Sequence, residues 1–124
     1  TPEETLPARL DQAVLETIRS MQRPGKPDLL GKVLGVYLDQ TPPILEKMRE
    51  AREATDLGAI LEQAHGLKSS SAYVGAARLA ALCERLEHLA KEGGIAAASP
   101  LVALIDEEFI AVAEEFGSLR QEAA

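Results

Sequence analysis

The sequence predicts an all-α fold, an up-down antiparallel four-helix bundle with an additional short N-terminal helix. Apolar residues recur at intervals of three and four along most of the chain, and no stretch alternates in the manner of a strand. Hydrophobic residues make up 46% of the 124 residues but aromatic residues only 3%, so the core is expected to be aliphatic, as in packed helices. The later loops are short, which makes neighbouring helices antiparallel.

The first two helices are separated by a proline-rich loop. The first helix carries an apolar stripe from Leu10 to Met21 and ends before the segment 23–27, in which two prolines flank a glycine. Asp28 is the expected N-cap of the second helix. Within that helix, Thr41-Pro42-Pro43 predicts a kink or a short break, because proline lacks a backbone donor and disfavours helix in the preceding residue. Alternatively, a new turn of helix begins within this tripeptide.

The third helix is expected to begin at Thr55 or Asp56 as its N-cap and to end at Gly75. Its core-facing stripe includes Ile60, Ala64, Leu67 and Ser71.

Glycine and proline mark the ends of the last two helices. The fourth helix is expected to stop at Gly93-Gly94, and the Ala-rich segment 95–98 is expected to form a turn. Ser99-Pro100 then opens the fifth helix, whose apolar stripe reaches Phe116.

The length suits one domain, and we expect residues 1–124 to form it, with a core over about residues 10–119. Glu3, Glu4 and the tail after Leu119 are expected to fray. The net charge of −7 argues against nucleic acid and against direct contact with anionic membranes. One cysteine permits no internal disulfide, which is compatible with a reducing cytoplasm. No leader and no apolar run of the roughly 18 residues needed to span a membrane is visible. The absence of an initial Met suggests a domain from a longer chain.

The third helix carries the one segment that looks chemical. His65, Lys68, Ser69 and Ala72 are related by steps of three and four, so they share a helix face that differs from the apolar stripe. An amine and a hydroxyl are therefore expected beside an exposed imidazole.

The hairpin between the third and fourth helices adds a partner for the histidine. If the hairpin folds near Ala76, Glu87 lies level with His65, and Glu84 lies level with Lys68. Glu87 is then placed to accept a hydrogen bond from one imidazole nitrogen. This bond would fix the tautomer and leave the other nitrogen nucleophilic.

Simpler interpretations stay open on spacing alone. A lone histidine on a helix is usually a surface residue, and the run Ser69-Ser70-Ser71 in a purely structural bundle would merely allow close packing. His88 is expected to be such a surface residue, and two histidines are too few ligands for a metal site. Cys83 falls on the apolar stripe and is expected in the core.

Taken together, these residues form a longer pattern. It reads Ala64-His65-Gly66-Leu67-Lys68-Ser69-Ser70-Ser71, then Gly75-Ala76, then Leu79 to Glu87 with Cys83 inside it, and upstream the segments 27–30 and 37–42 fit as well. The pattern resembles the histidine-containing phosphotransfer (HPt) domain of multistep phosphorelays, over about residues 10–119. The family's core motif is roughly A-H-x-L-K-G-S-[SA]-x-x-x-G-A.

The resemblance implies a role for each matching residue. His65 is implied as the phosphoacceptor, Lys68 as the cation that stabilises the phosphoryl group, and Glu87 as the residue that orients the imidazole. Gly75 matches the family's turn glycine. Ser69 stands where the family usually has glycine, which lets a receiver domain approach closely. Serine adds only a hydroxymethyl group, so docking is expected to survive with altered partner choice, and the hydroxyl is a candidate contact for the phosphoryl group.

The resemblance also implies the partners. A receiver-domain aspartate would donate the phosphoryl group and another would accept it, with no autonomous catalysis by this domain, no cofactor of its own, and Mg²⁺ supplied by the receiver. The expected docking face comprises Leu38, Gln40, Ala64, Ser69, Ala72 and Tyr73. A monomer in the cytoplasm is expected, free or as the cytoplasmic part of a membrane-anchored hybrid sensor histidine kinase. The alternatives are a substrate (P1-like) domain of a chemotaxis-type histidine kinase and a degenerate bundle used only for docking.

Overall fold

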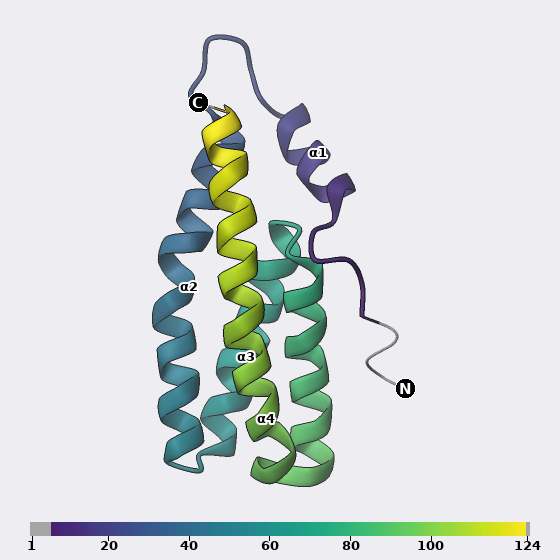
Figure 1. Cartoon of the computed structure of the whole chain (residues 1–124), viewed down its shortest axis with the longest axis vertical. Helices are drawn as coiled ribbons and strands as arrows, with labels where there is room; N and C mark the ends of the chain where they lie inside the picture. Colours follow the sequence, from purple (N-terminus) through teal and green to yellow (C-terminus); the bar gives the residue numbers. More distant parts are fainter. Residues whose placement is uncertain (1–5, 124) are drawn as a thin grey trace.

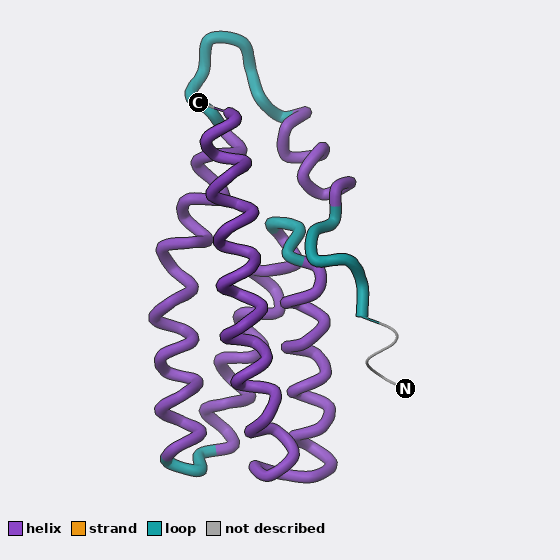
Figure 2. The backbone as a smooth tube through the Cα atoms, viewed as in Figure 1, coloured by secondary structure: helices purple, strands orange, loops and turns teal. Residues whose placement is uncertain are grey.

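The computed structural model describes residues 6–123, all of whose regular structure is helical (Figures 1 and 2). The elements are α1 (Gln12–Ser20), α2 (Leu29–Glu53), α3 (Leu57–Tyr73) and the long segment α4 (Ala77–Ala123). Gly94, with φ 70° and ψ −154°, divides α4 into two arms that run in opposite directions. Helices α2 and α3 and the two arms of α4 form an antiparallel four-helix bundle, and α1 packs at one end of it, as predicted.

The core is aliphatic, as the composition predicts, and runs the length of the bundle. Three aromatic rings meet within it: Tyr37 of α2 contacts Phe109 and Phe116 of α4 edge to face, with ring centroids 6.1 and 5.9 Å apart. Leu15 and Ile18 are buried and fix α1 to the bundle.

Aspartates begin the first three helices. The Asp28 and Asp56 carboxylates accept backbone N–H groups three residues further on, at 3.0 and 3.1 Å, which confirms Asp28 and selects Asp56 over Thr55. Asp11 caps α1 in the same way, although the sequence pattern did not single it out.

Helix α2 continues through Pro42 and Pro43, so the predicted break is wrong. Both prolines are exposed to solvent, and each removes one backbone donor from the helix. On the opposite side, Tyr37 and Thr41 are buried, and the Thr41 hydroxyl donates to the Tyr37 carbonyl at 2.6 Å. Packing of this buried side outweighs the two lost backbone hydrogen bonds.

The predicted stop at Gly93-Gly94 is confirmed, but the predicted start of the last helix at Ser99-Pro100 is wrong. The second arm is helical directly after Gly94, so the segment 95–98 is helix rather than a turn. Alanine is the strongest helix former, and Ala98 is fully buried against the bundle. Glu3 and Glu4 lie outside the described residues, and beyond Leu119 the chain is helical to Ala123.

Candidate functional site

The imidazole of His65 lies on the outer side of α3, near the middle of the helix. Its side chain is 69% exposed, whereas the preceding residue, Ala64, is fully buried. The core stripe of Ile60, Ala64 and Leu67 fixes the rotation of α3, so the histidine is presented to solvent on a rigid element.

A carboxylate from the next helix lies between the histidine and the lysine. Glu87, on the first arm of α4, has Oε2 3.4 Å from His65 Nδ1 and Oε1 2.9 Å from Lys68 Nζ. The first contact is the one that the hairpin symmetry predicts. Glu84 lies beside Lys68 in the same cleft, as the alignment predicts. Lys68 nevertheless pairs with Glu87, because helical side chains lean toward the N-terminus and Lys68 thereby reaches the level of Glu87.

Glu87 and Lys68 each stabilise the ionised form of the other. Burial raises the pKa of Glu87, but the Lys68 ammonium and His65 together lower it by more. The pKa of Glu87 therefore lies below its usual value. The Glu87 carboxylate in turn raises the pKa of Lys68. Oε1 of Glu87 is fully buried and receives no well-directed hydrogen bond from the described residues, so its tie to Lys68 is ionic.

The α3–α4 turn sets the register of these two helices. Gly75 has a φ of +81°, and the Ala76 N–H donates to the Ser71 carbonyl at 2.8 Å, which closes the end of α3 as a Schellman motif. The Gly75 carbonyl accepts the Asp11 N–H at 2.8 Å, so the segment before α1 is fastened to the same turn.

Ser69 lies on the outer surface of α3, one turn beyond the histidine. Its hydroxyl donates to the His65 carbonyl at 3.4 Å, so in this structure it is directed at its own helix.

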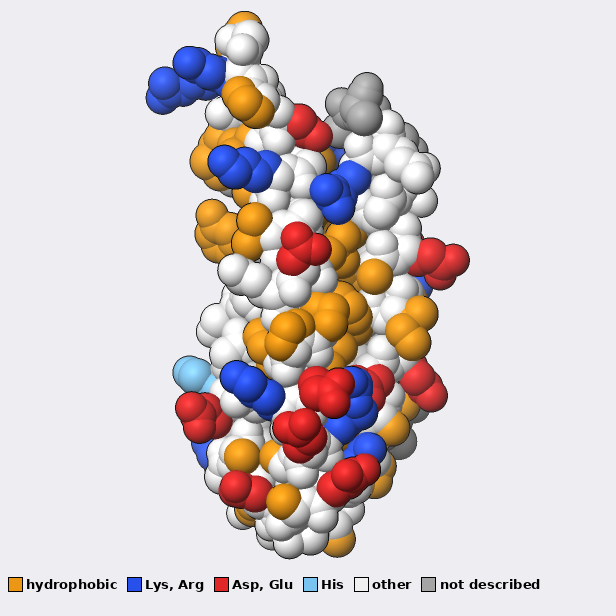
Figure 3. All heavy atoms as spheres, turned by 90° about the vertical axis from the view of Figure 1, so that its left-hand side faces the viewer, with side chains coloured by type: hydrophobic (Ala, Val, Ile, Leu, Met, Phe, Trp, Pro, Cys, Tyr) orange, Lys and Arg blue, Asp and Glu red, His pale blue; other side chains and the backbone are white. Residues whose placement is uncertain are grey.

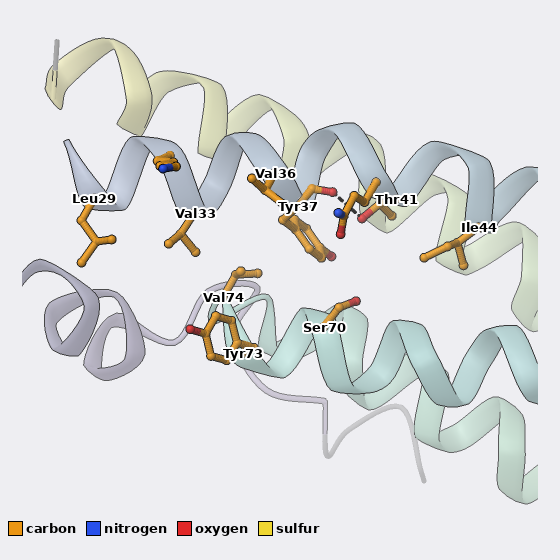
Figure 4. Close-up of a pocket in the computed structure, with 11 residues that line it drawn as sticks. Leu29, Val33, Val36, Tyr37, Thr41, Ile44, Ser70, Tyr73 and Val74 are labelled. Atoms are coloured by element: carbon orange, nitrogen blue, oxygen red, sulfur yellow. Dashed lines mark hydrogen bonds between the residues drawn. The ribbon is translucent and has the colours of Figure 1, made fainter. Parts of the chain in front are cut away.

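An apolar groove of about 460 Å³ lies between α2 and α3 (Figure 4). Its lining comprises Leu29, Lys32, Val33, Val36, Tyr37, Gln40, Thr41, Ile44, Ser70, Tyr73 and Val74. Figure 3, which views the molecule from the α2 side, shows hydrophobic side chains over the middle of this face. Val33, Val36 and Ile44 belong to a second apolar stripe of α2, whose spacing is a signal that the sequence analysis did not use.

The expected docking face is only partly brought together. Gln40 and Tyr73 line the groove, and Ser69 and Ala72 are exposed on α3. Ala64 is wrong as a docking residue, because it is fully buried.

Leu38 does not line this groove. It shares a helix face with Gly35 and Pro42, which face Arg120 and Phe109 of α4.

The two other candidates have the structural roles that the sequence predicts. His88 is 72% exposed and pairs with Glu92 at 3.1 Å. Cys83 is buried in the core, which raises the pKa of its thiol to about 12. Within residues 6–123, no three potential ligands among His, Cys, Asp and Glu are grouped to hold a metal ion. No helix in the same range is long and apolar enough to cross a membrane.

A helical bundle that presents an exposed histidine, backed by a carboxylate and flanked by a lysine, is typical of a carrier of phosphoryl groups. A family model described as "Hpt domain" matches residues 32–115. The chain belongs to this family, and its function is histidine phosphotransfer in a phosphorelay.

Solved structures share this fold. Histidine-containing phosphotransfer protein B (HptB) from Pseudomonas aeruginosa PAO1 has a TM-score of 0.84 and 28% identity, over 93% of this chain and 96% of that chain. Histidine-containing phosphotransfer protein MtHPt2 from Medicago truncatula has a TM-score of 0.79 at 21% identity, over 93% of this chain and 78% of that one, a likeness of fold.

Curated relatives are much longer proteins. Sensor histidine kinase GacS of Pseudomonas protegens is 35% identical over 68 residues, which is 55% of this chain and 7% of GacS. Sensor protein GacS of Pseudomonas syringae pv. syringae is 34% identical over 68 residues, again 55% of this chain and 8% of that protein. The matched segment therefore spans less than a tenth of these relatives.

Proposed function

We propose that His65 is the phosphoacceptor, which takes a phosphoryl group from the aspartate of one receiver domain and passes it to the aspartate of another. The observation that carries this proposal is the contact between His65 Nδ1 and the ionised Glu87. A neutral imidazole has one N–H and one lone pair, and a carboxylate beside Nδ1 favours the proton there. The lone pair is then on Nε2, the ring's other nitrogen.

The transfer needs no general base on this domain. Nε2 attacks the phosphorus of the receiver's acyl phosphate, the Nε2–P bond forms, and the P–O bond to the aspartate breaks. Lys68 lies one turn along α3 and compensates the charge of the phosphoryl group. A divalent cation held by the receiver, expected to be Mg²⁺, would add to this compensation. On this proposal the domain carries the group and does not catalyse on its own.

The receiver docks over the groove and the outer face of α3. Lys32 is the one charged residue in the groove lining, although the chain carries a net charge of −7, so an apolar partner surface meets no carboxylate there. Two small residues, Gly66 and Ser69, cover α3 between the groove and the histidine. A Cβ at Gly66 would meet nothing within 4 Å, so this surface leaves room for a close approach.

We further propose that the domain works as a monomer in the cytoplasm, as part of a hybrid sensor histidine kinase. The GacS relatives support this, because both are sensor proteins far longer than this chain. The lone, buried cysteine is compatible with a reducing compartment.

The test of the phosphoacceptor compares two histidine variants. Wild type, His65→Gln and His88→Gln are incubated with a phosphorylated receiver, and acid-labile, alkali-stable label is counted. Wild type and His88→Gln should become labelled, and His65→Gln should not, at unchanged helicity by circular dichroism. Label on His65→Gln at the wild-type level would overturn the proposal.

A further inference from the structure

Glu87 contacts His65 from beneath, on the side of the ring that faces the bundle. The Glu87 side chain is 14% exposed, against 69% for His65, and its Oε2 is 3.4 Å from Nδ1. A phosphoryl group on Nε2 would stand on the other edge of the ring. The carboxylate therefore acts on the imidazole without touching the group that is transferred.

The proton on Nδ1 decides how readily a phosphohistidine gives up its phosphoryl group. If Nδ1 keeps its proton, the ring carries a positive charge and leaves as neutral imidazole when the next aspartate attacks. If Nδ1 has lost its proton, the ring has to leave as an anion, which is a much poorer leaving group. A negative charge next to Nδ1 stabilises the protonated form.

We propose that the Glu87 carboxylate keeps Nδ1 of His65 protonated while Nε2 carries the phosphoryl group, so that the phosphohistidine stays ready for onward transfer. This inference rests on the proposed function of His65. In the onward step the Nε2–P bond breaks and its electron pair returns to Nε2. A P–O bond forms to the receiver aspartate, and the Nδ1 proton stays in place. Glu87 is thus a positioning residue for a proton, beyond its orientation of the ring.

The surrounding charges support this role. Lys68 of α3 lies 2.9 Å from the other oxygen of Glu87 and keeps the carboxylate ionised. Glu84 of α4 and Asp11, before α1, are the acidic groups that line the adjoining cleft beside Lys68. Glu87 is the one carboxylate that contacts His65 in the described part of the chain.

The test separates the charge of Glu87 from its shape. Wild type, Glu87→Gln and Glu84→Gln are phosphorylated with phosphoramidate, a small donor that needs no receiver, and are then held at pH 8. Glutamine keeps an oxygen that accepts the Nδ1 hydrogen bond but lacks the negative charge. Glu84→Gln is the matched control, because it removes the same charge from the same helix at an exposed position.

Two rates and one spectrum are measured. In Glu87→Gln the half-life of the phosphohistidine should lengthen, and transfer to a fresh receiver should slow, each on the order of five- to tenfold for a unit charge about 4 Å away. The ¹⁵N spectrum of the phosphorylated domain should show a larger fraction of protonated Nδ1 in wild type than in Glu87→Gln. Glu84→Gln should behave as wild type.

Each remaining outcome has a definite meaning. Wild-type rates in Glu87→Gln would overturn the inference. The inference would also be overturned if Glu87→Gln, folded by circular dichroism, accepted no phosphoryl group from phosphoramidate, because the carboxylate would then be needed for phosphorylation of His65. A wild-type domain that takes no label on His65 would instead overturn the proposed function.

Discussion

Replacement of Gly75 by alanine tests the turn that aligns the histidine with its carboxylate. Gly75 has a φ of +81°, and an added Cβ would lie 3.1 Å from the Asp11 carbonyl oxygen. A left-handed conformation costs a non-glycine residue about 1–2 kcal/mol. A shift of Asp11 would also weaken its hydrogen bond to the Gly75 carbonyl, which contributes about 0.5–1.5 kcal/mol. Alanine also reduces the conformational entropy of the unfolded chain, which stabilises the folded state by about 0.4–1 kcal/mol. We therefore expect Gly75→Ala to lower the free energy of unfolding by about 1–2 kcal/mol.

The assay is urea denaturation followed by circular dichroism, with Gly66→Ala as the matched control. Gly66 lies inside the same helix, and a Cβ there would meet nothing within 4 Å. Alanine should raise the stability at this position by about 0.5–1 kcal/mol, because glycine is a poor helix former. The two variants should thus move the midpoint in opposite directions. A Gly75→Ala domain as stable as wild type would refute the account of this turn.

Three further predictions follow from the site and the groove. Lys68→Ala should slow transfer from a phosphorylated receiver and shorten the half-life of the phosphohistidine, as followed by loss of label; an unchanged rate would remove Lys68 from the site. Val36→Glu puts a charge into the apolar groove and should weaken receiver binding, measured by calorimetry, on the order of tenfold. Ile110→Glu changes another exposed apolar residue, on α4, and should leave receiver binding unchanged; equal losses would reject the groove as the docking surface. Because the pKa of Glu87 is lowered in the fold, its contribution to stability is present above the ordinary glutamate value near 4.5 and is lost as pH falls through the lowered pKa. The stabilities of wild type and Glu87→Gln should therefore converge in acid, and a constant difference down to pH 2 would contradict this sign.

Features that depend on local chemistry could be predicted from the sequence. Asp28 and Asp56 cap helices because their short carboxylates reach free backbone donors, and Gly94 ends a helix because it adopts a positive φ. The contact between His65 and Glu87 followed from the symmetry of a hairpin about its turn. These predictions needed only the helical period and the position of a glycine.

Features that depend on packing could not be predicted from the sequence. Pro42 removes a backbone hydrogen bond from α2. The helix continues through it because the buried side of α2 packs against the core. Whether Leu38 lines the groove depends on how α2 packs against its neighbours, and the groove lining does not include it. Lys68 bonds to Glu87 rather than to Glu84 because of the lean of its side chain, which counting from the turn ignores.

The central claim is that Nε2 of His65 carries the phosphoryl group. The domain is phosphorylated by a receiver with ¹⁵N-labelled histidine in the chain, and coupling between ³¹P and the ring nitrogens is recorded by NMR. The account predicts coupling to Nε2 of His65, the nitrogen that Glu87 leaves free. A phosphoryl group on Nδ1 of His65, or on His88, would contradict it.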